Sequence, residues 1–212
     1  MNNLIFDLDG TLVDSSKSII RALTESCKIL DIEPLIPFSK VKIGPPLDKI
    51  LQSILPSEES SLYDLFKHTF IKLYDRKFCK DCVVYPGALH ALSQAAKNAD
   101  LFLVTNKRIS PTINILRHHQ ILKIFKGILG SDSISNVGLS KSMSISYLIQ
   151  DFGLDRSQCT YFGDTGADAI SCQEAGIDFV FTTWGYGNIN EVSDLQVKTM
   201  DNWNKLANFA KD

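Results

Sequence analysis

The chain has 212 residues, of which 44% are hydrophobic and 22% charged, and its formal net charge is −2. This composition fits a soluble folded protein, either one domain with an insertion or two small domains, and argues against a disordered chain. No basic cluster offers a footprint for nucleic acid, and the apolar runs are too short to span a bilayer. Because the first predicted strand begins within three residues of the N-terminus, we expect no signal peptide and a cytoplasmic location.

The first predicted element is a short buried strand at 4–6, which is followed by two carboxylates, Asp7 and Asp9. Residues two apart in a strand point to the same face, so an extended chain would place these side chains together. A hard divalent cation would relieve their repulsion, and Gly10 would allow a sharp turn beneath it. An Asp-rich surface turn is the alternative. A calcium loop of the EF-hand type is disfavoured because Leu12 stands where a ligand oxygen is expected.

Residues 15–82 show helical periodicity and no convincing strand, which predicts a small helical bundle. The second predicted helix follows the turn at 44–46. The third begins at 56–57, where Glu58 and Glu59 suit the positive end of the helix dipole. The apolar faces of the three helices are, in chain order, Ile19, Ile20, Leu23, Cys27 and Leu30; Leu47, Ile50, Leu51, Ile54 and Leu55; and Leu62, Leu65, Phe66, Phe70, Leu73 and Tyr74.

From Val83 onward, strands and helices alternate. Strands are predicted at 101–104, 127–130, 160–162 and 179–181. Helices are predicted after 85–87 (with Leu89, Leu92, Ala95 and Ala96 on the apolar face), from Ser110–Pro111, after Lys141 and at 168–175. These strands are too apolar to have one face in water, which favours a parallel sheet covered by helices on both sides. The predicted fold is therefore α/β, a doubly wound parallel core formed by 1–14 and 83–212 with an inserted helical cap domain at 15–82.

Five cysteines occur in a chain with no export signal, so reduced thiols are expected. Cys79 and Cys82 form a C-x-x-C pattern, for which the candidate roles are redox chemistry and zinc binding, but no second ligand pair at suitable spacing supports a zinc site. The neighbouring residues His118 and His119 have no carboxylate or cysteine close to them in sequence. We favour no functional role for either pair.

Polar side chains follow the predicted strands where each leaves the sheet, and in an open α/β sheet the site lies beyond these carboxyl ends. The set comprises Asp7, Asp9, Thr105, Asn106, Asp164 and Asp168, with Lys141 at the entrance of a helix. Singly, each residue has an ordinary interpretation as a turn, a helix cap or a solvated side chain. Together, acidic groups with a hydroxyl and a cation suit a phosphate ester bound with magnesium.

In this order, Asp7-Leu8-Asp9-Gly10-Thr11, Thr105, Lys141 and Gly163-Asp164-x-x-x-Asp168 resemble the haloacid dehalogenase-like hydrolase superfamily. Further stretches look like its phosphoglycolate phosphatase branch, namely 12–15, 44–47, 85–87, 105–107 and 183–187. One departure is that Ser142 and Ser144 follow Lys141, where this branch usually has prolines.

The resemblance implies a magnesium-dependent phosphatase that hydrolyses a small, phosphoglycolate-like phosphate monoester through an aspartyl-phosphate. It implies that Asp7 is the nucleophile and that Asp9 is the general acid and base. Magnesium would be held by Asp7, the Asp9 backbone carbonyl and Asp164, with Asp168 supporting the metal or Lys141. The phosphoryl group would be bound by Asp7, Gly10, Thr105, Asn106 and Lys141, of which Lys141 is also counted as catalytic.

Other activities stay open. Within the superfamily they are a sugar-phosphate mutase, a 5'-nucleotidase and a pyrophosphatase. A receiver-like phospho-acceptor signalling domain is more distant, because it would leave the helical insertion unexplained. The expected partner is a small phosphorylated metabolite, with no nucleic acid and no membrane, and the expected state is a monomer or small homo-oligomer. We expect residues 15–82 to act as a mobile lid whose turn at Gly44, flanked by Lys40, Lys42 and Lys49, contributes to substrate specificity.

Overall fold

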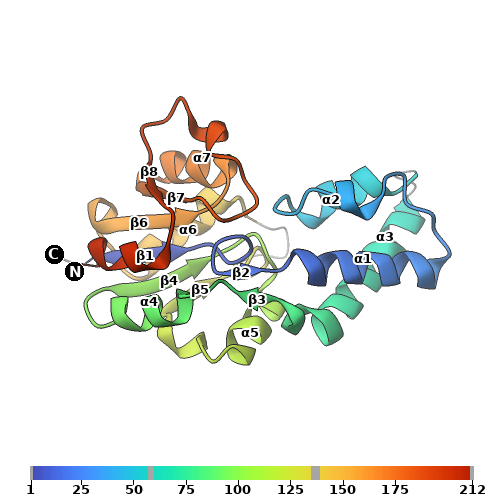
Figure 1. Cartoon of the computed structure of the whole chain (residues 1–212), viewed down its shortest axis with the longest axis horizontal. Coiled ribbons are helices and arrows are strands. Elements are labelled where there is room, and N and C mark those ends of the chain that lie inside the picture. The colour runs from blue at the N-terminus through green and yellow to red at the C-terminus, as the bar shows by residue number, and fades with distance from the viewer. Residues whose placement is uncertain (1, 57–59, 135–138, 211–212) are drawn as a thin grey trace. The chain divides into compact units, whose positions relative to one another are not determined.

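The computed structural model describes residues 2–56, 60–134 and 139–210 (Figure 1). The chain forms two compact units, one made of 1–14 and 84–212 and the other of 15–83. Within the described ranges, every helix falls short of the length and apolar character that crossing a membrane requires.

The larger unit is built on a six-stranded sheet in which all neighbouring strands are parallel. Its strands are β1 (Asn3–Phe6), β4 (Asp100–Val104), β5 (Gly127–Leu129), β6 (Cys159–Gly163), β7 (Asp178–Thr182) and β8 (Lys198–Met200), in the spatial order β5-β4-β1-β6-β7-β8. The chain passes from β1 outward through β4 to β5 and then returns to the other side of β1. This reversal places the topological switch point at β1, and polar residues that follow β1 therefore lie where such sheets bind ligands.

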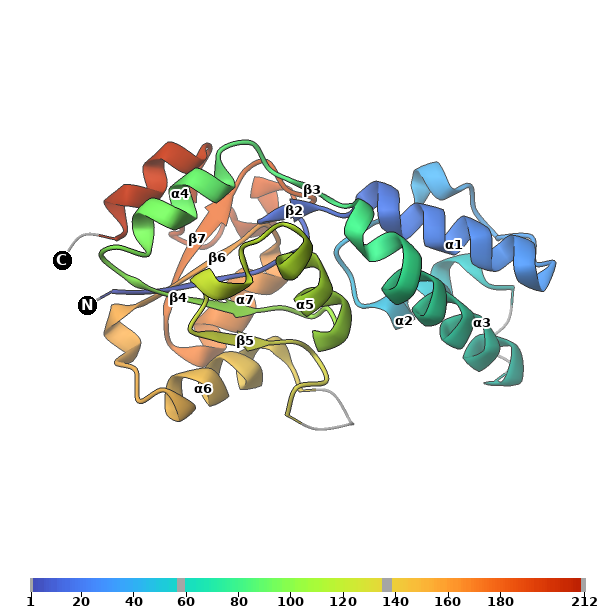
Figure 2. The ribbon, with the colours of Figure 1, turned by 90° about the horizontal axis from the view of Figure 1, so that it is seen from below.

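Helices cover both faces of this sheet (Figure 2). The helices of this unit are α4 (Ala88–Ala95), α5 (Ile109–His118), α6 (Lys141–Asp151), α7 (Gly166–Ala175) and the 3-10 segment η7 (Trp203–Asn208). Side chains of α6 and α7 share a buried cluster with Ile5 of β1. The next residue, Phe6, points to the opposite face, where it stacks on Phe162 at 4.9 Å between ring centroids and meets Trp203. The predicted parallel sheet with helices on both sides is confirmed.

The smaller unit is helical. It contains α1 (Ser16–Leu30), α2 (Leu47–Ile54) and α3 (Ser60–Leu73), and α3 continues through a π-helical turn (Tyr74–Phe78) and a 3-10 turn (Cys79–Asp81). Leu23, Leu51 and Phe66 are fully buried, so each of the three helices contributes to one core. Two chain segments connect the units, and β2 (Val13–Asp14) and β3 (Val83–Val84) on these segments pair as a two-stranded sheet.

Several local predictions are wrong. Leu65 and Leu89 are 51% and 44% exposed, because the buried stripe of each helix is narrower than the sequence pattern indicates. Ala96 is exposed because α4 has already ended at Ala95. Strand β8 is missing from the sequence-based prediction, because two of its three residues are exposed and it carries no apolar run.

Two helix starts also differ from the prediction. Helix α5 begins at Ile109 rather than after a Ser110 cap, and the Ile109 amide donates to Asp132 Oδ1 at 2.7 Å. The capping group thus comes from a distant segment, which a local sequence pattern does not reveal. Helix α7 begins at Gly166, because Thr165 and Asp168 form a reciprocal capping box ahead of it. The sequence predicts that the third helix begins at 56–57, and Ser57, Glu58 and Glu59 lie outside the described residues.

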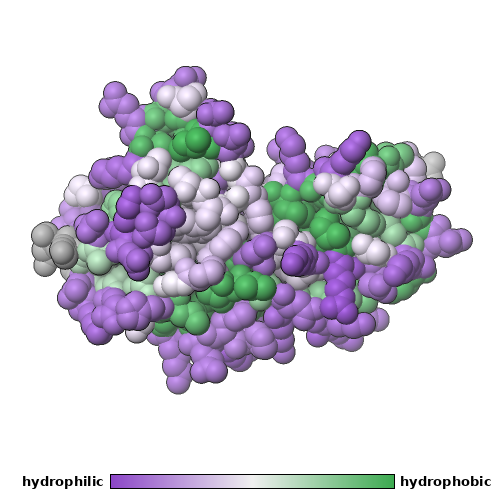
Figure 3. Space-filling model, viewed as in Figure 1, coloured by the Kyte–Doolittle hydropathy of each residue, from purple (hydrophilic) through white to green (hydrophobic). Residues whose placement is uncertain are grey.

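Hydrophilic side chains cover most of the face in Figure 3, and hydrophobic residues gather in separate patches. This pattern is ordinary for a protein surface in water.

Candidate active site

The site begins where β1 ends. The Asp7 amide donates to the Phe162 carbonyl of the neighbouring strand β6 at 2.9 Å, so Asp7 continues the sheet register one residue past β1. Its side chain is 10% exposed. The sheet therefore fixes the backbone that carries this carboxylate.

Three buried carboxylates meet at this edge of the sheet. Oxygens of Asp7, Asp164 and Asp168 all lie within 4.8 Å of one another. Lys141 is the first residue of α6, and its Nζ lies 3.2 Å from Asp7 Oδ2 and in direct contact with Asp168 Oδ1. Asp168 Oδ2 accepts the Thr165 hydroxyl at 2.7 Å, so both Asp168 oxygens have partners. The ammonium group of Lys141 thus contacts two of the three carboxylates.

Burial and the crowding of like charges shift the pKa values in this cluster. Burial, followed by repulsion from Asp168 and Asp9, raises the pKa of Asp7 to about 6 despite the attraction of Lys141. Burial and repulsion from Asp7 and Asp168 raise the pKa of Asp164 to about 7. Burial alone would lower the pKa of Lys141, but Asp168 and Asp7 outweigh it and raise that pKa. Without a further positive charge, full ionisation of this cluster at neutral pH is costly.

Asp164 is held by a glycine-rich loop that follows β7. The Tyr186 amide donates to Asp164 Oδ2 at 2.7 Å, and the Thr11 hydroxyl donates to Oδ1 at 3.2 Å. A Cβ atom at Gly10, Gly185 or Gly187 would overlap Asp164, so each glycine permits close approach. The positive φ of +82° at Gly10 further favours glycine there. The motif at 183–187 therefore forms part of the site, where it packs against and binds the Asp164 carboxylate.

The donor set fits a hard divalent cation. Asp7 Oδ1 is buried and has no hydrogen-bond partner among the residues that the structure describes. An acceptor left unsatisfied in this way is costly unless something binds it. Carboxylate oxygens are the ligands that Mg²⁺ prefers, and a cation beside Asp7 and Asp164 would bring both pKa values down. Since Asp168 is engaged by Lys141 and Thr165, it suits a supporting position better than direct coordination.

The second carboxylate of the β1 motif, Asp9, has separate surroundings. The chain turns after β1, with the Gly10 amide donating to the Val13 carbonyl at 2.8 Å, so Asp7 and Asp9 do not continue one extended strand. Lys107 Nζ lies 2.7 Å from Asp9 Oδ2, and the two side chains are 8% and 18% exposed, respectively. Lys107 belongs to the motif at 105–107, but the sequence pattern alone predicts no role for it.

The remaining residues predicted for the site are Thr105 and Asn106, which follow β4, and Gly44 in the smaller unit. Thr105 is buried, and its Oγ1 accepts the Lys107 amide at 3.3 Å, which leaves its hydroxyl proton available to a ligand. Asn106 is exposed. Gly44 belongs to the smaller unit, ahead of α2, where its φ is +116°. Its role in specificity stays a prediction.

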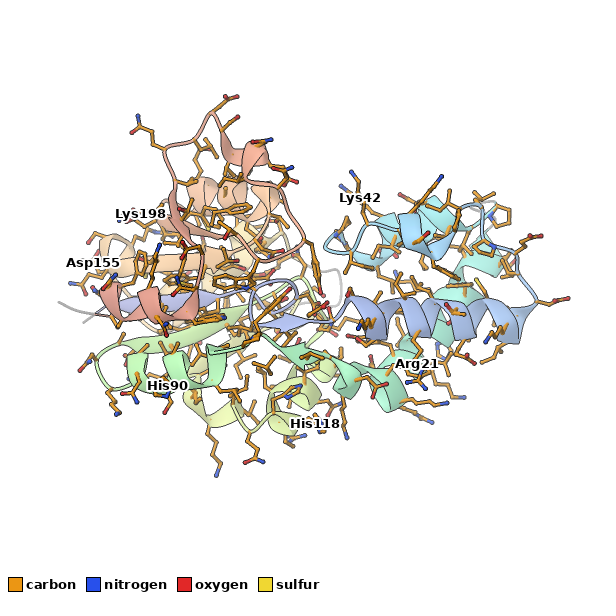
Figure 4. The ribbon with its side chains drawn as sticks, viewed as in Figure 1. Arg21, Lys42, His90, His118, Asp155 and Lys198 are labelled. Carbon is orange, nitrogen blue, oxygen red and sulfur yellow. The ribbon has the colours of Figure 1, made fainter. Side chains whose placement is uncertain are left out.

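Among the described residues, neither the cysteines nor the histidine pair contributes a ligand atom to this acidic cluster. All five cysteines are buried and outside any disulfide, and burial raises the pKa of Cys27, Cys159 and Cys172, which disfavours the reactive thiolate. His118 is exposed on α5 (Figure 4), and its ring lies edge-on to that of His119.

Comparison with known proteins places the chain in a family. The model of the family described as haloacid dehalogenase-like hydrolase matches residues 4–182. A phosphoglycolate phosphatase of Aquifex aeolicus (strain VF5) is 30% identical, over 95% of this chain and 98% of its own. A 5'-nucleotidase of Pseudomonas aeruginosa is 26% identical, over 90% of this chain and 86% of its own. A solved haloacid dehalogenase-like family hydrolase from Streptococcus pneumoniae shares the fold with a TM-score of 0.86 at 25% identity, covering 99% of this chain and 98% of its own.

The family match extends from β1 through β7 and so includes Asp7, Asp9, Thr105, Lys141, Asp164 and Asp168. This protein belongs to the haloacid dehalogenase-like hydrolase family.

Proposed function

We propose that the protein is a Mg²⁺-dependent phosphatase that hydrolyses a small phosphate monoester through a phosphoryl intermediate on Asp7. The observation that carries this proposal is the buried Asp7 carboxylate, which has one oxygen near Lys141 and the other without a partner among the described residues. A carboxylate held in this way is ready both to bind a cation and to attack phosphorus. The phosphoglycolate phosphatase and 5'-nucleotidase among the relatives support the same reaction class, phosphoric monoester hydrolysis.

The side chains of Asp7 and Asp164, with the backbone carbonyl of Asp9, would hold Mg²⁺. When bound there, the cation would supply positive charge that attracts the phosphoryl oxygens and offsets the carboxylate repulsion described above. Asp168 keeps Lys141 in place, because its oxygens are divided between Lys141 and the N-terminal cap of α7.

In the first step, an Asp7 oxygen attacks phosphorus while the bond from phosphorus to the ester oxygen breaks. Asp9 donates its proton to the departing oxygen, so an alcohol leaves and Asp9 becomes a carboxylate. Asp7 then carries the phosphoryl group as a mixed anhydride.

In the second step, Asp9 takes a proton from a water molecule whose oxygen attacks the same phosphorus. The bond from phosphorus to Asp7 breaks, which releases inorganic phosphate and restores both the Asp7 carboxylate and the Asp9 proton. Lys141, the Thr105 hydroxyl and the amides that follow Gly10 and Thr105 would bind the phosphoryl oxygens, on which negative charge is spread in both transition states.

The first substrate candidate is phosphoglycolate, because a relative that matches 95% of this chain is named for it. Nucleoside 5'-monophosphates are the second candidate, because a relative of similar coverage is a 5'-nucleotidase. We propose that the helical unit, including the turn at Gly44, selects between such leaving groups.

A hydrolysis panel tests the proposal. Inorganic phosphate release would be measured with phosphoglycolate, nucleoside 5'-monophosphates, hexose phosphates and pyrophosphate, in Mg²⁺ and in EDTA. We expect turnover of at least one monoester that requires the cation. Lack of hydrolysis across the panel, or hydrolysis that EDTA leaves unchanged, would contradict the proposal.

A further inference from the structure

The site contains two lysine–carboxylate pairs, one at each aspartate of the motif that follows β1. Lys141 contacts Asp7 Oδ2 at 3.2 Å, and Lys107 contacts Asp9 Oδ2 at 2.7 Å. In each pair the second carboxylate oxygen, Oδ1, is buried without a hydrogen-bond partner among the described residues. Each lysine therefore holds one oxygen of its carboxylate and leaves the other available.

The Lys107 pair is built from two separate segments. Asp9 follows β1, and Lys107 follows β4, so the contact spans 98 residues of sequence. The Lys107 amide donates to Thr105 Oγ1 at 3.3 Å, which ties the same residue to the hydroxyl proposed to bind phosphate. The chain thus couples Asp9 to the β4 loop through both the backbone and the side chain of Lys107.

Stability alone explains this pair poorly. A lysine and a carboxylate that are 8% and 18% exposed lose most of their hydration, and such a pair adds little to stability relative to apolar residues. The chain also offers a comparison, because Lys126 and Asp100 pair at the same distance of 2.7 Å with side chains that are 58% and 21% exposed. The more exposed pair needs no functional explanation.

We infer that Lys107 is a positioning residue for Asp9. Lys107 binds Asp9 Oδ2, so that Asp9 Oδ1 is the oxygen that exchanges protons with the leaving group and with water. This inference rests on the proposed function. Proton transfer by a positioned group typically contributes about 10²–10⁴-fold, and a displacement of about 1 Å can cost about 10²-fold. Loss of Lys107 should therefore impair the steps that need the Asp9 proton more than the steps that do not.

Aryl phosphates of similar shape and graded leaving-group acidity test this inference. The constant kcat/KM reports the step that breaks the ester bond, and p-nitrophenolate leaves without a proton whereas phenolate and alkoxides need one. In Lys107→Met, we expect kcat/KM for the poorest leaving group to fall about 10²-fold and that for p-nitrophenyl phosphate to fall less than about 5-fold. Lys126→Met, the matched control, should leave both constants unchanged.

The single variant Asp9→Asn and the double variant Asp9→Asn/Lys107→Met separate positioning from a structural effect. In the Asp9→Asn background, Lys107→Met should not change the leaving-group dependence any further, because the group that Lys107 positions is gone. Thermal unfolding with and without Mg²⁺ checks that each variant folds and binds the cation. If Lys107→Met fails to fold, Lys107→Gln, which keeps a polar end, provides the same comparison.

An equal loss for all leaving groups, or no loss, would overturn the inference, as would an additive effect in the Asp9→Asn background. A wild-type enzyme that hydrolyses no phosphate monoester would instead contradict the proposed function, so the two failures are distinguishable.

Discussion

Removing divalent cations should make the stability of this protein fall as pH rises, and Mg²⁺ should reverse the fall. The perturbation is EDTA against Mg²⁺ across about pH 4 to 8, a range that covers the shifted carboxylates. Burial raises the pKa of Asp7 from 3.8 to about 6 and that of Asp164 from 3.8 to about 7. A carboxyl group whose pKa is raised by folding stabilises the folded state below pH 3.8, and this contribution is lost as pH rises through 6 and 7.

The magnitude follows from these values. At about 1.4 kcal/mol per pKa unit, ionising Asp7 in the folded protein costs about 3 kcal/mol and ionising Asp164 about 4 kcal/mol. Asp7 is itself one cause of the raised pKa of Asp164, so the combined free energy is on the order of 5 kcal/mol. For a chain of this length, about 1 kcal/mol corresponds to about 2–4 °C, which predicts a change in Tm of about 10 °C or more.

Thermal unfolding measures this effect directly. Mg²⁺ should raise the Tm strongly at about pH 8 and little at about pH 4, where protons already neutralise the cluster. Asp164→Asn should be more stable than the wild type in EDTA at about pH 8 and should lose most of the response to Mg²⁺. Asp178→Asn, at a side chain that is 65% exposed, is the control for the same substitution outside the site. A Tm in EDTA that does not fall as pH rises, or a Mg²⁺ response that is equal at both pH values, would show that these carboxylates do not destabilise the folded protein when they ionise.

Three further predictions concern single features. Asp7→Asn should keep the fold and lose turnover to background, because the attacking carboxylate is gone; appreciable Mg²⁺-dependent activity in the folded variant would contradict this. Gly185→Ala should weaken Mg²⁺ binding, measured by calorimetry, about 10-fold or more, because the new Cβ would displace Asp164. Gly153→Ala, where a Cβ meets nothing within 4 Å, should change only stability, and equal Mg²⁺ affinities in both variants would contradict the role of the 183–187 loop. Exchange of residues 40–49 for the segment of a related phosphatase should reorder substrate preference while the Mg²⁺ requirement persists; an unchanged order would locate specificity in the larger unit.

The sequence predicts the sheet and the cluster around Asp7 for the same reason. Continuous apolar runs indicate strands that are buried on both faces, as in a parallel sheet, and the carboxyl ends of parallel strands meet at one edge of the sheet. That rule is enough to expect Asp7, Asp164 and Asp168 to lie together, and the structure brings them together with Lys141. The chemical roles of these residues rest on the proposal above.

A local sequence pattern does not predict contacts that depend on how a loop turns. The pair between Lys107 and Asp9 forms because the chain bends after β1 and again after β4, and no local pattern encodes that meeting. The same holds for the cap that Asp132 provides to α5. The amide of Tyr186 reaches Asp164 only because glycines on both sides of that residue allow the loop to approach.

In the proposed reaction, a phosphoryl group passes through Asp7. Rapid acid quenching of the enzyme during turnover with Mg²⁺, followed by peptide mass spectrometry, would detect it. We predict a phosphoryl group on Asp7 that hydroxylamine removes, as expected for an acyl phosphate. A phosphoryl group on another residue, or turnover in which no phosphoryl enzyme forms, would contradict the account.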